Sequence, residues 1–233
     1  MFKTIKKYFK KESLLIQSYQ ETEKTLQTCK EMFAETVKSL RYSDSAELSI
    51  DIREKDKQIN NYQQEVRRKM LTHLAISPKT EVNPALVLIS IVIDVERIGD
   101  YTKNIEDLAK AHPKRLNGGQ YEETIKQLED EVKSKFESVT SAFTVYDVGA
   151  AKEIMDDHRS ITKECDKIIT RFVAEQISDI PGNDAVALAL YLRYLKRISS
   201  HLTNIVSSVV NPFDMIGYSD KDKKKKDNGV NNQ

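Results

Sequence analysis

Apolar residues recur along this chain at steps of three, four and seven positions. That spacing places them on one face of a helix, and it predicts six long amphipathic helices with almost no strand. Polar runs and prolines mark the ends: Ser77 and Pro78 stop the second helix, and Asn83 before Pro84 caps the third. The predicted helices cover residues 12–41, 48–76, 83–112, 125–146, 151–172 and 185–210.

The two halves of the chain resemble each other. Residues 97–105 align with 197–205 at an offset of 100, so that Arg, Ile, Thr, Asn and Ile coincide. At an offset of 102 the second helix aligns with the fifth, and Ile59 falls on Ile161. Such self-similarity indicates a duplicated unit. The sequence therefore predicts an all-α fold of two tandem three-helix bundles. The expected parts are a basic N-terminal segment at 1–11, a first repeat at 12–116, a second repeat at 120–212 and a disordered lysine-rich tail at 217–233.

Composition supports this fold class and excludes several functions. The 233 residues include 7 Gly, 5 Pro and no Trp, which is typical of long helices rather than of a sandwich or barrel. The net charge of +1 leaves no basic face for nucleic acid. Cys29 and Cys165 are solitary, so neither a disulfide framework nor a zinc knuckle is indicated. A reducing, cytoplasmic location fits.

Membrane contact remains open at one end of the chain. The longest apolar run, residues 85–93, is well short of the roughly 20 residues that span a bilayer. Segment 1–11 carries five lysines around Phe2, Ile5 and Phe9. It is either an amphipathic helix on an anionic membrane surface or a basic helix start that packs its aromatic side chains on the body.

Candidate chemistry begins with two acidic residues that follow the apolar run. Glu96 and Asp100 are four positions apart and share one face of a helix. Like charges so placed destabilise a helix unless a metal ion, a neighbouring Arg or Lys, or water neutralises them. Arg53, Arg67 and Arg97 are available for pairing without any metal.

Asp56 adds a third carboxylate to this region. It falls on an apolar stripe between Ile52 and Ile59, so it faces the bundle, where an unpaired charge is very unfavourable. The second and third helices are expected to be antiparallel neighbours, which would bring Asp56 to Glu96 and Asp100. Such oxygen ligands suit Mg²⁺, Mn²⁺ or Ca²⁺, and iron where several carboxylates bridge.

These acids do not indicate an enzyme. The chain has no glycine-rich phosphate loop, nucleophile elbow or Cys/His dyad, and it lacks the Glu-x-x-His pairs of di-iron bundles. We therefore expect a non-enzymatic protein. A metal-free helical adaptor stands as the alternative to a metal-binding regulator.

The motif Glu96-Arg97-Ile98-Gly99-Asp100, followed by Asn104-Ile105 in the third helix of a duplicated unit, resembles that of the PhoU family of phosphate-signalling proteins. The likeness extends from about residue 13 to 212. It implies two similar three-helix bundles, each with a metal motif on its third helix. It also implies a role in restraining the phosphate-starvation response, between a phosphate transporter and a membrane histidine kinase.

Residue by residue, the resemblance makes Glu96 and Asp100 metal-binding carboxylates, and Asp56 the second-helix acid that assists them. The metal would be Mg, Mn, Fe or Zn. The second motif departs from the family pattern, because Lys196 and Ser200 stand where Glu and Asp are expected.

One interpretation of the second bundle is that the ammonium of Lys196 takes the place of a metal ion and supplies the positive charge itself. His158 and His201 either form a weaker transition-metal site there or are hydrogen-bonded core histidines.

The expected function follows from this resemblance. The protein is expected to be a cytoplasmic regulator, located at the inner face of the membrane when bound. Its expected partners are a membrane phosphate transporter or its ATPase, a histidine kinase, or both, and a homo-oligomer is left open. No nucleic-acid partner is expected.

Overall fold

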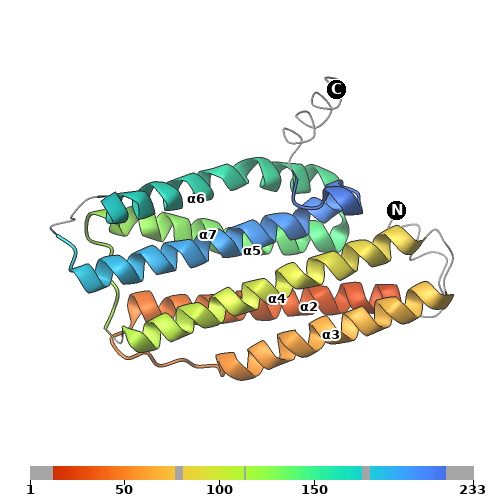
Figure 1. The fold of residues 1–233 in the computed structure, drawn as a ribbon, viewed down its shortest axis with the longest axis horizontal. Coiled ribbons are helices and arrows are strands. Elements are labelled where there is room, and N and C mark those ends of the chain that lie inside the picture. The colour runs from red at the N-terminus through yellow and green to blue at the C-terminus, as the bar shows by residue number, and fades with distance from the viewer. Residues whose placement is uncertain (1–12, 77–80, 113, 175–178, 219–233) are drawn as a thin grey trace, which may run out of the picture.

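The computed structural model describes residues 13–76, 81–112, 114–174 and 179–218, without the side chains of residues 157–159. Six long α-helices and two short 3₁₀ turns account for most of this part of the chain, and the described residues contain no strand (Figure 1). The helices are α2 (Leu14–Tyr42), α3 (Ile52–Ile76), α4 (Val82–Ala111), α5 (Glu122–Val145), α6 (Val148–Ala174) and α7 (Gly182–Val210), and the turns are η2 (Gly119–Tyr121) and η3 (Phe213–Met215).

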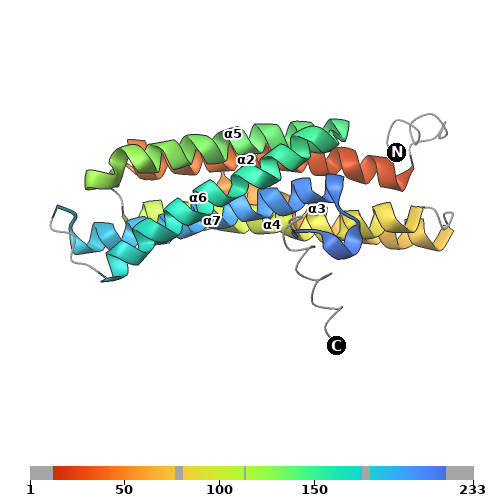
Figure 2. The same ribbon diagram turned by 90° about the horizontal axis from the view of Figure 1, so that it is seen from above.

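The helices lie along the long axis of the molecule in two layers (Figure 2). Helices α2 and α5 form one layer and contact each other. The other layer has the order α3, α4, α7, in which each helix packs on the next, and α6 runs obliquely between the two layers and packs on both α7 and α5. Helices α2 to α4 make the first bundle and α5 to α7 the second, so the predicted pair of three-helix bundles is confirmed. The bundles meet mainly at α4 and α7 and at α2 and α5.

The contacts between the bundles follow an approximate two-fold relation. Phe33 of α2 contacts Phe136 of α5, with ring centroids 5.5 Å apart. On α4 and α7, Asp94 pairs with His201, and Tyr101 packs on Tyr194. A shift of one hundred residues exchanges these two pairs, which is what a two-fold axis between antiparallel repeats requires. The duplication seen in the sequence is therefore also a symmetry of the structure.

The predicted apolar stripes form one core shared by both bundles. Leu26, Cys29 and Phe33 of α2 are buried, as are Val132 and Phe136 of α5, and they belong to a single cluster with side chains from every other long helix. None of the described helices has a stretch that is both long and apolar enough to cross a bilayer. Segment 1–11 and residues 219–233 of the tail lie outside the described residues, so the predictions for them stay untested.

Helix α3 starts later than the apolar stripe predicted. The stripe began at Leu48, but α3 begins at Ile52. The reason is a cap: the side chain of Asp51 accepts a hydrogen bond from the backbone N–H of Glu54 at 2.9 Å. An N-terminal aspartate of this kind satisfies a backbone donor that has no partner within the helix.

Two other helices begin slightly before their predicted caps. Helix α4 starts at Val82, so Asn83 and Pro84 lie in its first turn rather than at its boundary. Proline is tolerated there because the first-turn N–H groups have no partner within the helix. Helix α7 starts at Gly182, directly after Pro181, and not at the predicted Asn183 cap.

Candidate functional site

Asp56 lies where its position on the apolar stripe predicted. It is on the buried face of α3, with 9% of its surface exposed, and it points toward α4. Its Oδ2 atom accepts hydrogen bonds from Nδ2 of Asn60 at 3.3 Å and from Nζ of Lys103 at 2.8 Å. The aspartate is thus held by its own helix and by α4.

Glu96 and Asp100 lie one turn apart on α4, and both are partly buried. Burial and the charges of Asp100 and Asp56 raise the pKa of Glu96, against the opposing effect of Arg97. The guanidinium of Arg97 is 3.6 Å from the carboxylate of Glu96 and 3.4 Å from that of Asp100. The cluster therefore holds more negative charge than its immediate cations balance.

Lys103 links the two helices. Its ammonium donates to Asp56 at 2.8 Å and to Asp100 at 3.0 Å, so it lies between the two carboxylates. Burial lowers the pKa of Lys103, but the hydrogen bonds to Asp56 and Asp100 outweigh it, and the net shift is upward. Sequence reasoning allowed for an Arg or a Lys as the partner but named only arginines, so it did not single out this lysine. The available signal was its position three residues after Asp100, on the same helix face.

Arg53, which was also considered from the sequence, has a different role. Arg53 pairs with Glu106 and Asp107, at the far end of α4 from Glu96. Only Arg97 of that set has a described contact with the acid pair.

The residues present suit a hard divalent cation in ligand type. Asp56, Glu96 and Asp100 offer carboxylate oxygens from two packed helices, which is how helical bundles build metal sites. Within the described part of the chain, however, no three His, Cys, Asp or Glu side chains are arranged closely enough to hold a metal. At this place the ammonium of Lys103 lies between two of the three candidate ligands. Metal binding here would require that ammonium to leave.

The corresponding place in the second bundle is organised around a cation. The ammonium of Lys196 contacts both carboxylate oxygens of Asp166 on α6, at 2.6 and 2.7 Å. The hydroxyl of Ser200 donates to the carbonyl oxygen of Lys196. The charge of Lys196 is therefore neutralised by an aspartate that sequence reasoning did not single out.

His201 faces the first bundle. Its Nδ1 atom is 2.7 Å from Oδ1 of Asp94, and the same oxygen accepts a hydrogen bond from Asn204 at 2.9 Å. The ring of His201 stacks on Tyr101 at 5.7 Å. His201 thus joins α7 to α4. The side chain of His158, its partner in the weaker metal site considered from the sequence, lies outside the described residues.

A buried polar cluster missed by sequence reasoning joins the bundles near the end of α2. Arg41 is fully buried and pairs with Glu129 at 2.8 Å and with Glu122 at 2.9 Å. Glu129 also accepts hydrogen bonds from the hydroxyls of Tyr42 and Tyr191, at 2.7 and 2.9 Å. Burial, followed by the charge of Glu129, raises the pKa of Tyr191 well above its ordinary value, so the phenol remains a donor.

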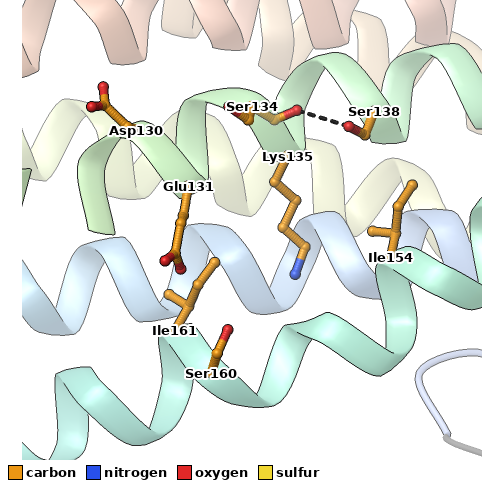
Figure 3. A pocket seen from close by; sticks show the side chains of 8 residues that line it. All are labelled: Asp130, Glu131, Ser134, Lys135, Ser138, Ile154, Ser160 and Ile161. Carbon is orange, nitrogen blue, oxygen red and sulfur yellow. Dashed lines mark hydrogen bonds between the residues drawn. The ribbon is translucent and has the colours of Figure 1, made fainter. Parts of the chain in front are cut away.

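A cavity of about 470 Å³ opens between α5 and α6 in the second bundle (Figure 3). Lys135 extends from α5 into it and hydrogen-bonds Ser199 of α7 at 3.2 Å, while Glu131 points toward Ile161 (Figure 3). Lys135 is largely buried. The two-fold relation places Phe136 of α5 opposite Phe33 of α2. In the same register, Lys135 corresponds to the apolar Met32 of the first bundle. The second bundle therefore carries a cation in its core and another at its motif.

Comparison with known proteins follows the same division into repeats. The model of the PhoU domain matches residues 22–109 and 125–209, one copy in each bundle. The crystal structure of the phosphate transport system regulatory protein PhoU from Streptococcus pneumoniae is similar, with a TM-score of 0.74 and 19% identity over 84% of this chain and 93% of that one. PhoU from Pseudomonas aeruginosa gives a TM-score of 0.67 at 19% identity, over 85% and 93%. No curated protein matches the sequence.

Proposed function

The chain belongs to the PhoU domain family, and from this we propose that it is a non-enzymatic regulator of phosphate transport. The observation that carries the proposal is the match of both bundles to that domain, together with a fold similar to that of a phosphate transport regulatory protein. Its partner would be a membrane phosphate transporter or its ATPase, a histidine kinase, or both. It would meet that partner from the cytoplasmic side.

A long, two-layered helical body suits this role. Two of its helices present an apolar groove near the connection between α6 and α7, where Val173, Val186 and Leu190 are exposed. Charged residues cover much of the remaining surface, as in proteins that bind others through helix faces. This arrangement supports binding to a partner rather than turnover of a substrate.

The test of this function is removal of the gene from its host. Deletion is expected to change phosphate uptake and to raise expression from a phosphate-starvation promoter in phosphate-rich medium. Restoring the full-length chain on a plasmid should return both to their starting values. Unchanged uptake and unchanged expression after deletion would contradict the proposed role.

The finer part of the proposal is a divalent metal ion held by Asp56, Glu96 and Asp100. Three carboxylates from two helices support it, because such oxygen ligands suit a divalent cation. The raised pKa of Glu96 also supports it, because nearby negative charge contributes to that shift and a cation would relieve this repulsion. Metal analysis of protein purified without chelator tests it. Wild-type protein should carry Mn, Fe, Zn or Mg that Asp100→Ala lacks.

A metal-free adaptor is the second candidate, and one observation favours it. Lys103 and Arg97 already pair with the acids without any metal. Equal and negligible metal content in wild type and Asp100→Ala would select the adaptor.

A further inference from the structure

Six helix ends meet at one end of the body. The helices alternate in direction, so α2, α4 and α6 begin at the end where α3, α5 and α7 finish (Figures 1 and 2). The contacts agree: Tyr19, near the start of α2, stacks on Phe143, near the end of α5, and η3 after α7 packs on α4. We call this the N/C end, because the chain enters the body there at Leu14 and leaves it there at Tyr218.

Exposed apolar side chains gather at the N/C end. Among the described residues, most of the large apolar side chains that are exposed lie here: Leu71, Ile76, Val82, Val145, Val148, Phe213 and Tyr218. Leu71 and Ile76, in the last two turns of α3, have 72% and 77% of their surface exposed. Such side chains gain free energy when a partner surface or a lipid layer removes them from water.

Positive charge is concentrated in the two segments that join the body at this end. Segment 1–11 has five lysines and no acidic residue, and residues 219–233 of the tail have five lysines and three aspartates. Together the two segments carry a net charge of +7, whereas the whole chain carries +1, so residues 12–218 carry −6. The sequence therefore attaches two basic segments to one end of an acidic body.

Segment 1–11 also combines its charge with apolar side chains. Phe2, Ile5, Tyr8 and Phe9 have the spacing of one helix face, and the lysines stand between them. Aromatic and basic residues in such a pattern suit the boundary between lipid headgroups and acyl chains. The same two properties, apolar and basic, thus occur in this segment and at the end of the body that it joins.

We propose that the N/C end is a membrane-contact surface, which binds the anionic headgroups of a lipid bilayer through the lysines of the two segments. The exposed apolar side chains of this end, with Leu71 and Ile76 foremost, enter the interfacial layer. The inference deepens the proposed function and rests on it only for the choice of membrane, which is the one that holds the phosphate transporter.

Charge complementarity favours a bilayer over an acidic protein as the occupant. A bilayer with anionic lipids offers a continuous negative surface and an apolar layer beneath it, so it satisfies both the lysines and the exposed apolar side chains. The acidic body is repelled by the same surface. Attraction at one end and repulsion along the rest would make the long body stand on its N/C end.

The test is co-sedimentation of the full-length protein with vesicles. One set contains equal parts of phosphatidylglycerol and phosphatidylcholine, and the other contains phosphatidylcholine alone. The protein should bind the anionic vesicles and not the neutral ones, and added salt should weaken the binding, because it screens the charges. Soluble poly-glutamate in place of vesicles stands for an acidic protein partner, and it should bind less tightly than the anionic vesicles.

Two matched triple variants test the charges. Lys6→Gln/Lys7→Gln/Lys10→Gln should weaken binding to the anionic vesicles about 100-fold, because each lysine near an anionic membrane strengthens binding roughly fivefold. The control is Lys57→Gln/Lys126→Gln/Lys167→Gln, which removes the same charge from exposed sites on α3, α5 and α6 away from the N/C end. It should bind like wild type.

A third variant tests the body itself. Leu71→Ser/Ile76→Ser should weaken binding to the anionic vesicles by at least about 10-fold and leave binding to poly-glutamate unchanged, because it removes apolar area without changing charge. Both side chains are exposed, so the variant should keep its helices and its Tm, which circular dichroism checks.

The outcomes decide between occupants. Selective binding to anionic vesicles, weakened by both the lysine and the apolar variant, supports the membrane contact. Equal or tighter binding to poly-glutamate would overturn it in favour of an acidic partner. No binding to anionic vesicles, or binding that the lysine variant leaves unchanged, would also overturn it. If the lysine variant nevertheless restores the phosphate response of a deletion strain, the proposed function stands without the membrane contact.

Discussion

Arg41 offers the sharpest test of how the two bundles are held together. Its guanidinium is fully buried and joins the end of α2 to two carboxylates of α5, Glu129 and Glu122. It also contacts the carbonyl oxygen of Leu116. Arg41→Met keeps much of the volume and removes the charge, so it isolates the electrostatic role of the residue.

The expected loss is large because Glu129 would remain buried without its cation. Only 6% of the Glu129 side chain is exposed, and its remaining partners are the neutral hydroxyls of Tyr42 and Tyr191. Removing one partner of a buried ion pair typically costs about 3–5 kcal/mol of unfolding free energy. For a chain of this size, that corresponds to a fall in Tm of roughly 6–20 °C.

The assay is urea and thermal unfolding followed by far-ultraviolet circular dichroism. Lys30→Met is the control, because Lys30 also joins α2 to α5, through Glu137, but on the surface. It should unfold like wild type. The double variant Arg41→Met/Glu129→Gln should regain part of the loss, since the uncompensated charge is gone. A loss below about 1 kcal/mol in Arg41→Met, or additive effects in the double variant, would refute this reasoning.

Three further outcomes are expected. The two cysteines are buried, and burial raises the pKa of each thiol to about 12, so neither should react with a disulfide reagent near pH 8 until the protein unfolds. Gly99→Val should lower the unfolding free energy by about 1–3 kcal/mol, because even a Cβ at Gly99 would lie 3.0 Å from Ile59. Burial lowers the pKa of His112, but its hydrogen bond to Asp184 outweighs this and the net shift is upward. That pair stabilises the fold below the unfolded pKa of about 6.5 and loses its effect as the pH rises through the folded value, so Asp184→Asn should lower Tm at pH 6 more than at pH 9.

Much of the fold follows from sequence periodicity, because a buried helix face needs apolar residues at regular spacing. The same rule located Asp56: a carboxylate between Ile52 and Ile59 had to face a neighbouring helix, and it faces α4. Helix starts were less predictable. Asp51 caps α3, so the helix begins at Ile52 and does not include Leu48, although Leu48 continues the apolar spacing.

The partners of the charged residues were the least predictable part. The ammonium of Lys103 contacts Asp56 and Asp100 because of the conformation of its side chain. The spacing of residues along the helix does not determine that conformation. Arg41 and Glu129 are 88 positions apart, so only the packing of α2 on α5 brings them together. Spacing within one helix predicts which residues share a face, but contacts between helices depend on how the bundles dock.

Helix α4 connects the candidate metal site with the second bundle. One face carries Glu96 and Asp100. The residues that flank this pair, Asp94 and Tyr101, both contact His201 on α7. Because the repeats are antiparallel, the two motifs lie at similar levels on opposite sides of the central α4 and α7 pair. The first motif is acidic, whereas the second is already neutralised by an internal ion pair. Among the described residues of the two motifs, the charge imbalance that a cation could relieve therefore lies in the first bundle, and α4, which packs on α7, is one of the helices that join this bundle to the other.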